Sequence, residues 1–340
     1  MAKDTPTRHL DDDELPEQLN IEEFNQVDPG PLECFPKRAL PLDLFHYKEE
    51  INVLVPLYKA GRELKATERK EFRELSRRGR LFFSRNQQKE YVECLEGNLE
   101  VAMDDPNLSA GDVAHIFAEA LVLQQEELYA NPKADLMELL FSGLELLSVF
   151  LGVDRNNARH LVENVHRNRT RQRLHSNAAF MALALYIRVN DNRVVVDSMP
   201  FTALAFFLYD IGMNKISRLV SDKPGQLSPD EMRRMKEHPR WGMDIIDRLG
   251  LHRSDVKEPA LQHHERVDGS GYPTGLRGVE IGDLGRVMAV ADSYVSMITD
   301  RPDLPGKDPV EAAAELVGRD KAFDTKVCRI LVQYLQEIRC

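Results

Sequence analysis

The chain has 340 residues, of which 42% are hydrophobic and 30% are charged, with 19 Gly and 18 Pro. This composition is typical of a globular protein and excludes a collagen-like, disulfide-stapled or wholly disordered chain. The length predicts two or three domains. The four cysteines lie far apart and lack CxxC spacing, which favours free thiols in a reducing compartment, so we expect a cytoplasmic protein.

The formal net charge of −11 is concentrated near the start of the chain, where residues 1–36 carry ten acidic side chains against Lys3 and Arg8. The rest of the sequence lacks the positive field that attracts nucleic acid, so we expect no nucleic-acid partner. No apolar core of a signal peptide occurs in this acidic segment. We expect residues 1–40 to form an acidic, disordered tail.

Residues 41–108 carry the patterns of a small α/β module. Apolar side chains alternate along 51–57, which predicts a strand, and Pro56 places that strand at a sheet edge because proline cannot donate to a ladder. The run 81–83 suits a second strand. This module contains no candidate nucleophile, phosphate loop or metal site, so we interpret it as a sensory or dimerisation module.

From residue 110 onward the periodicity is helical, with segments at 110–130, 134–151 and 155–188. The most apolar stretch, 136–151, is interrupted by Glu138 and Glu145 and is shorter than the roughly 20 residues of a spanning helix. We therefore expect a buried helix and no membrane span.

A capping box over residues 228–231, with proline at the first helical position, predicts another helix further along the chain. The fold class is thus mainly α. Connecting helices over 109–170 would precede a helical domain over 171–340. A homodimer would form through the N-terminal module or the connecting helices.

Six potential metal ligands occur in the helical region. Imidazoles and carboxylates gathered from several helices are what a transition-metal site in a bundle needs, and one aspartate can bridge two ions. Each residue alone is more simply explained as a packed or surface side chain, and the argument for a metal rests on the set. In chain order the set is His175, Asp210, His238, His263, His264 and Asp292.

The loop from His263 to Gly278 carries several glycines and one proline, and here the chain resembles the HD-GYP branch of the HD-domain phosphohydrolases. The resemblance covers roughly residues 170–330 through many ordered pieces. These pieces are His175-Ser176, YDIG at 209–212, KPGQLSPDE at 223–231, KEHPRWG at 236–242, HHERVDGSGYPTGLRG at 263–278, RVMAVADSY at 286–294, DRP at 300–302 and FD at 323–324.

The resemblance implies an HD-type helical bundle and a hydrolase of cyclic di-GMP with two or three iron or manganese ions. Such ions activate a water molecule and clamp the phosphodiester. By the resemblance, Asp210 would bridge two ions. One coordination sphere would include His238, His263 and His264, and the other would include His175 and Asp292.

This sequence departs from the family at the expected chemistry. The signature His-Asp pair is Tyr209-Asp210, and ordinary tyrosine is a poor substitute for histidine in a divalent site. Arg171 stands where trinuclear members have a glutamate, and its fixed positive charge repels a metal. Met213 replaces the lysine expected to touch substrate phosphate. We expect the Tyr209 phenol to pack in the site and hydrogen-bond Asp210 or Asp292.

We therefore predict a degenerate HD-GYP protein of bacterial cyclic di-GMP signalling, with weak or no phosphodiesterase activity, that acts as a ligand sensor or interaction module. It would hold at most one iron or manganese ion. Two alternatives stay open: an active metal-dependent phosphodiesterase with an unusual metal site, and a structural scaffold that binds neither metal nor nucleotide.

The loop retains its family sequence beside the altered chemistry, so we expect it to contact a ligand or partner. By the resemblance, the ligand would be cyclic di-GMP or the partner a diguanylate-cyclase-type domain. The alternative is that the loop only covers the bundle end. The candidate loop residues are Arg266, Asp268, Gly269, Gly271, Tyr272 and Pro273.

Overall fold

The computed structural model describes residues 21–95, 97–154, 156–190, 197–221, 223, 225–300, 304–319 and 321–338. The chain divides into two compact units, Met1–Leu108 and Ser109–Cys340. Each unit has its own core. Most of the chain is helical, with one small sheet, as the sequence predicts.

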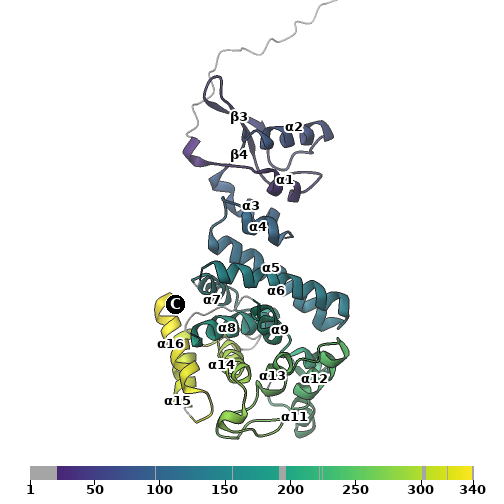
Figure 1. The fold of residues 1–340 in the computed structure, drawn as a ribbon, viewed down its shortest axis with the longest axis vertical. Helices are drawn as coiled ribbons and strands as arrows, with labels where there is room; N and C mark the ends of the chain where they lie inside the picture. Colours follow the sequence, from purple (N-terminus) through teal and green to yellow (C-terminus); the bar gives the residue numbers. More distant parts are fainter. Residues whose placement is uncertain are drawn as a thin grey trace, which may run out of the picture. The chain divides into compact units, whose positions relative to one another are not determined.

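The first unit contains a four-stranded antiparallel sheet in the order β1-β4-β2-β3, covered by short helices (Figure 1). Strand β3 is an edge strand, and Pro56 lies within it, as the sequence predicts. The strands are β1 Phe24–Gln26, β2 Leu44–Lys48, β3 Val53–Tyr58 and β4 Leu81–Ser84. The helices are η1 Ile21–Glu23, α1 Pro29–Cys34, α2 Ala66–Arg77, η2 Arg85–Gln87, α3 Gln88–Leu95 and α4 Leu99–Asp104.

The expectation of a disordered tail over residues 1–40 is wrong for residues 21–40, and residues 1–20 lie outside the described part. Strand β1 pairs with β4, with Phe24 opposite Ser84. Val27 and Phe35 are fully buried among the sheet and helices. Apolar side chains lie between the acidic residues of this segment, and burial of these apolar side chains orders it.

The second unit contains helices joined by loops, with no strand among its described residues. Its central helix is α8, whose residues 178–185 are all buried and which packs against α7, α9, α14 and α16 (Figure 1). The helices are α5 Ala110–Ala130, α6 Ala134–Val153, α7 Asn157–Arg167, η3 Arg171–Arg173, α8 Leu174–Val189, α9 Met199–Phe207, η4 Ile211–Lys215, α10 Arg218–Ser221, α11 Pro229–Met235, α12 His238–Arg248, α13 Ser254–Gln262, η5 Gly278–Glu280, α14 Asp283–Ile298, α15 Pro309–Gly318 and α16 Thr325–Ile338.

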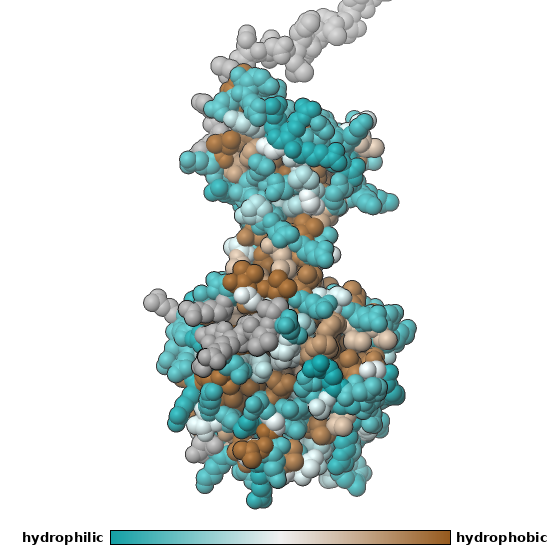
Figure 2. All heavy atoms as spheres, viewed as in Figure 1, coloured by the Kyte–Doolittle hydropathy of each residue, from teal (hydrophilic) through white to brown (hydrophobic). Residues whose placement is uncertain are grey.

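Helices α5 to α7 belong to the same compact unit as the later helices, whereas the sequence predicts connecting helices over 109–170. Helix α6 is the one described helix long and apolar enough to cross a membrane by length and composition. It packs against α5 and α9, with Leu140 and Leu147 buried and Leu139 and Val149 exposed. The predicted buried helix is therefore buried on one side. Hydrophobic residues also lie among hydrophilic ones on the face of the second unit in Figure 2.

The predicted single helix over 155–188 is broken. Helix α7 ends at Arg167, a 3-10 turn η3 follows, and α8 begins at Leu174. The Asn177 side chain donates to the carbonyl of Asn168 and holds the break. Arg171 therefore lies in the 3-10 turn η3, whereas His175 lies in α8, so the two residues do not share one α-helix. The capping box over 228–231 is confirmed at the start of α11.

Candidate metal centre

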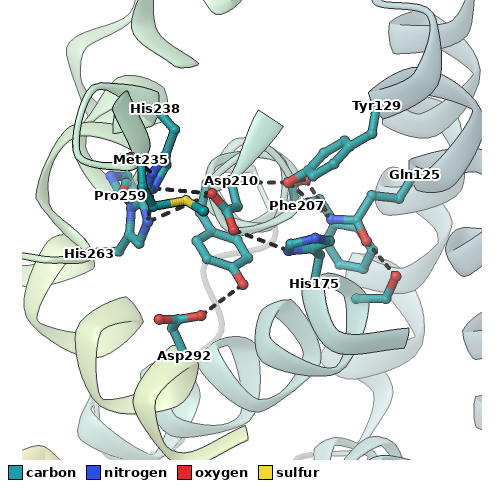
Figure 3. Close-up of polar contacts among 12 residues, drawn as sticks. Gln125, Tyr129, His175, Phe207, Asp210, Met235, His238, Pro259, His263 and Asp292 are labelled. Atoms are coloured by element: carbon teal, nitrogen blue, oxygen red, sulfur yellow. Dashed lines mark hydrogen bonds and ion pairs between the residues drawn. The ribbon is translucent and has the colours of Figure 1, made fainter. Parts of the chain in front are cut away.

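Five chain segments bring the predicted ligands into one region of the second unit. His175 lies in the first turn of α8, and Asp210 follows the end of α9. His238 begins α12, His263 follows α13, and Asp292 lies on α14. Figure 3 shows Asp210 between the pair His238 and His263 on one side and His175 on the other.

The imidazoles of His238 and His263 face each other, with 3.0 Å between their Nε2 atoms. The Nδ1 atom of His238 lies 2.6 Å from the carbonyl oxygen of Met235, and Nδ1 of His263 lies 2.9 Å from that of Pro259. A carbonyl only accepts, so each Nδ1 carries the proton and each Nε2 presents a lone pair. This is the arrangement that backbone partners give to metal-binding histidines.

Asp210 adds a third electron-pair donor to the two facing nitrogens. Its Oδ1 lies 3.3 Å from His238 Nε2 and 3.9 Å from His263 Nε2. Oδ1 is buried and accepts no hydrogen bond from the described residues. The two Nε2 atoms and Asp210 Oδ1 thus point lone pairs at one another with no proton between them. Such an arrangement is unfavourable without a partner, and a bound cation would stabilise it. These residues therefore fit the metal ion that the HD-GYP resemblance implies.

His264 completes the cluster, since one ring nitrogen from each of His238, His263 and His264 lies within 4.8 Å of the others. Burial lowers the pKa of His263 to about 4, although the charge of Asp210 opposes the shift. Burial and then the neighbouring His263 lower the pKa of His264 well below its usual range. Both imidazoles are therefore neutral near pH 7, which is the state that binds a metal.

On the other side of Asp210, its Oδ2 lies 3.2 Å from Nδ1 of His175. Burial alone would raise the pKa of Asp210, but His238, His175 and His263 hold it below its usual value. Asp210 is thus an anion that faces two histidine groups, which is the position predicted for a bridging ligand. Burial lowers the pKa of His175, but Asp210 and then Asp292 outweigh burial and hold that pKa above its usual value, against the opposing charge of Arg171. The Arg171 guanidinium donates to the carbonyl of Ser221 at 2.5 Å.

Tyr209 lies next to Asp292, the last of the six predicted ligands. Its hydroxyl donates to Oδ1 of Asp292 at 3.0 Å, and the Tyr209 side chain is buried. Burial and the charges of both aspartates raise the pKa of Tyr209 well above its usual value, so the group is a neutral phenol. Burial and then Asp210 raise the pKa of Asp292 to about 6. The predicted hydrogen bond from Tyr209 to an aspartate is confirmed.

Three supporting contacts are not evident from the sequence. Tyr129 on α5 accepts from the backbone N–H of Asp210 at 3.2 Å and donates to the carbonyl of Phe207 at 3.1 Å. Gln125, one turn earlier, donates to the same carbonyl at 2.7 Å. Helix α5 therefore holds the end of α9 from which Asp210 projects. No local motif marks these residues, because their partners lie about 80 positions away.

The loop over 263–278 folds back tightly on the histidine pair. A Cβ at Gly271 would meet backbone atoms of His264, Glu265 and Arg266 at 2.5 Å, so only glycine fits this close approach. Glu265, which the sequence analysis misses, is buried and accepts from three successive backbone N–H groups, those of residues 274–276. This carboxylate fixes the backbone of residues 274–276 in the second half of the loop.

The other predicted loop residues have mostly internal contacts. Arg266 donates to the carbonyls of His263 and Glu265, and its guanidinium lies over the Phe323 ring. Asp268 accepts from the backbone N–H of Ser270 at 2.9 Å, and Gly269 has a positive φ of 81°. Pro273 differs, because it lines a surface hollow together with Tyr272. Met213 is half-buried in η4 and brings no charge.

The structure therefore gathers His238, His263 and His264 in one cluster, and Asp210 faces the first two of them. His175 reaches the other oxygen of Asp210, and Asp292 is hydrogen-bonded to Tyr209.

Comparisons with known proteins agree with this geometry. Residues 161–327 match the family model described as an HD domain. A cyclic di-GMP phosphodiesterase of Thermotoga maritima is 38% identical over 149 residues, which are 43% of this chain and 40% of that protein. Cyclic di-GMP phosphodiesterase PA4108 of Pseudomonas aeruginosa is 35% identical over 130 residues, which are 38% of this chain and 31% of that protein. The chain thus spans less than half the length of these relatives.

Among solved structures, Bd1817, a HDG"Y"P protein from Bdellovibrio bacteriovorus, matches with a TM-score of 0.61 and 17% identity over 92% of this chain and 99% of that one. This likeness shows the fold. Residues 161–327 define an HD domain by their sequence and their helical arrangement. The HHERVDGSGYPTGLRG loop lies beside the histidine cluster, so this HD domain is similar to the HD-GYP branch that its sequence resembles.

Proposed function

We propose that this chain is a degenerate HD-GYP protein that binds cyclic di-GMP, holds at most one iron or manganese ion, and hydrolyses the nucleotide slowly or not at all. Its relatives are named as cyclic di-GMP phosphodiesterases, which supports the ligand class. The observation that carries the proposal is the hydrogen bond from Tyr209 to Asp292.

Asp210, His238, His263 and His264 would hold the single ion. When bound, the ion supplies Lewis-acid chemistry to a phosphate oxygen. The chain's own contribution is positioning: backbone carbonyls orient His238 and His263, and Tyr129 fixes the backbone at Asp210. These contacts hold the ligand atoms in place before any ion binds, which lowers the ordering cost of binding.

A second ion would need the histidine that Tyr209 replaces, together with a free Asp292 carboxylate. The phenol is neutral, and it engages one oxygen of Asp292. Met213 supplies no positive charge to a phosphate, and Arg171 places one beside His175. The loss of a metal and a phosphate contact removes several kcal/mol of transition-state stabilisation, and each ~1.4 kcal/mol is a factor of ten in rate.

The test measures metal content and cyclic di-GMP hydrolysis on the same protein, purified with iron and manganese supplied. We expect at most one ion per chain and little or no hydrolysis. The combined variant Tyr209→His, Arg171→Glu, Met213→Lys should raise both metal content and hydrolysis. Tyr209→Phe is the matched control, since it removes the hydroxyl without supplying a ligand, and it should leave metal content unchanged. Two or three ions per parent chain at full occupancy would overturn the proposal.

The second candidate is an active phosphodiesterase with an unusual metal site. It is favoured by the buried Asp210 oxygen and the intact three-histidine cluster, which suffice for one catalytic ion. This candidate predicts hydrolysis by the parent protein that collapses in Tyr209→Phe.

The predicted protein partners remain part of the proposal. A diguanylate-cyclase-type domain would contact the loop over 263–278, and a second copy of the chain would form a homodimer. Sedimentation of the purified chain, alone and mixed with such a domain, tests both.

A further inference from the structure

Two surface hollows of about 620 Å³ each lie along helices α11 and α12, outside the cluster of metal ligands. Arg234 and Trp241 line both hollows, so these two side chains form their common wall. The first hollow is completed by Lys215, Asp244, Asp247 and Arg248. The second is completed by Asp230, Arg233, Lys236, Glu237, Arg240, Tyr272 and Pro273.

Charge pairing leaves two cations available in the second hollow. Arg233 pairs with Asp230, and Arg240 pairs with Glu237 at 3.4 Å. In the described part of the chain, the Arg234 side chain makes no hydrogen bond or ion pair, and the Lys236 side chain has no acidic partner. An anion that enters this hollow therefore meets two positive groups that need not break an existing pair.

Aromatic surface accompanies these cations. Trp241 is half-buried, and its indole N–H donates to no group in the described ranges. Tyr272 lines the same hollow, and Lys236 Nζ lies 5.3 Å from the centre of the Tyr272 ring. Flat aromatic faces beside cations suit a planar base with an attached phosphate, because the base stacks and the phosphate pairs.

The second hollow adjoins the histidine cluster through Tyr272. The Tyr272 ring stacks on His264 with 4.6 Å between centres and an interplanar angle of 27°. Arg240 donates to the carbonyl of Pro273 at 3.4 Å and ties the loop to α12. A ligand with one phosphate near His264 can thus extend over Tyr272 towards Trp241.

We propose that Trp241, Arg234, Lys236 and Tyr272 form a nucleotide-binding site, in which the base stacks on the aromatic rings and the phosphate pairs with the two cations. The choice of a guanine nucleotide rests on the proposed function, whereas the base-and-phosphate chemistry rests on the hollow. The net charge of −11 disfavours a long nucleic acid as the occupant.

The sequence supplies a direct probe, because Trp241 is its only tryptophan. Intact metal-stripped protein is titrated with GMP and, separately, with cyclic di-GMP, while tryptophan emission and its quenching by acrylamide are recorded. Both ligands should change the emission and protect Trp241 from acrylamide. Arg234→Ala should raise the dissociation constant about tenfold, as expected for the loss of one charge-assisted hydrogen bond. Arg159→Ala removes an arginine from α7, away from both hollows, and should leave it unchanged.

The outcomes separate this site from the proposed function. If GMP protects Trp241 but cyclic di-GMP binds nowhere on the metal-loaded protein, the nucleotide site stands and the proposed function fails. If calorimetry detects cyclic di-GMP binding that leaves Trp241 emission, its acrylamide quenching and the Arg234→Ala affinity unchanged, the proposed function stands and this site is wrong. Equal weakening by Arg159→Ala and Arg234→Ala would also overturn the site, because it would indicate a general charge effect.

Discussion

Tyr209 determines how the two sides of the centre differ. A histidine at this position would present a lone pair, whereas the phenol presents a proton and uses it on Asp292. The carboxylate thereby gains a donor inside the protein and satisfies one of its oxygens without a metal. A tyrosine in place of a histidine at position 209 thus turns Asp292 from a potential metal ligand into the acceptor of a buried hydrogen bond.

This pair predicts a stability effect. Tyr209→Phe leaves the Asp292 oxygen buried without its donor, which should cost about 1–3 kcal/mol of unfolding free energy. Tyr334→Phe is the matched control, because Tyr334 is equally buried and its hydroxyl makes no hydrogen bond among the described residues. Urea unfolding of the metal-free proteins measures both. Equal losses in the two variants would show that the Tyr209 hydroxyl contributes nothing specific.

The ligands were predictable at the residue scale and their supports were not. Histidine and aspartate are common metal ligands, and the order of these residues along the chain matches the HD-GYP motif. Tyr129 and Glu265 act on backbone N–H groups, a role open to many side chains, so only the tertiary structure assigns it. Arg266 illustrates the converse, since its place in the retained loop predicts a ligand contact, whereas its Nη1 donates to two nearby carbonyls.

At the scale of elements, the closest approach in the centre is between η4 and α12. A Cβ at Gly212 would lie 1.9 Å from the carbonyl oxygen of His238 and 2.7 Å from the backbone nitrogen of Gly242. Real atoms do not approach so closely, so a side chain at Gly212 must push the two helices apart. This contact sets the separation between Asp210, which precedes η4, and His238, which begins α12.

Gly212→Ala should therefore lower stability by more than about 2 kcal/mol and weaken metal binding. Gly111→Ala in α5 is the control, because its Cβ would meet nothing closer than 3.6 Å, and it should be neutral or stabilising by up to about 1 kcal/mol. Denaturant unfolding and metal titration of both variants give the comparison. Unimpaired metal binding in Gly212→Ala would contradict the idea that this contact positions the ligands.

Element boundaries followed the sequence where the pattern was strong and local. The capping box at 228–231 starts α11, and the alternation over 51–57 forms edge strand β3. The break after α7 was missed, although residues 167–173 are all polar and interrupt the apolar periodicity. The Asn177 side chain, nine positions after Asn168, holds the turn there. Strand β1 was missed because three residues within an acidic segment give too short a pattern.

At the scale of the whole molecule, the candidate metal centre lies in one of the two units. The candidate ligands all lie in Ser109–Cys340, and the sheet lies in Met1–Leu108. A metal that binds only the folded form stabilises the unit that holds it, by about 2.7 kcal/mol at a concentration one hundred times its dissociation constant. The effect should be confined to the second unit.

Hydrogen exchange read by mass spectrometry tests this directly. Iron or manganese should slow exchange in α12, α13 and α14, which carry or adjoin the ligands, and leave strands β1 to β4 unchanged. His263→Ala should abolish the protection, because it removes a buried nitrogen of the cluster. His252→Ala is the matched control, since that histidine is exposed and pairs with Asp247. Protection that survives His263→Ala, or that appears equally in the sheet, would place the ion elsewhere and contradict the proposed centre.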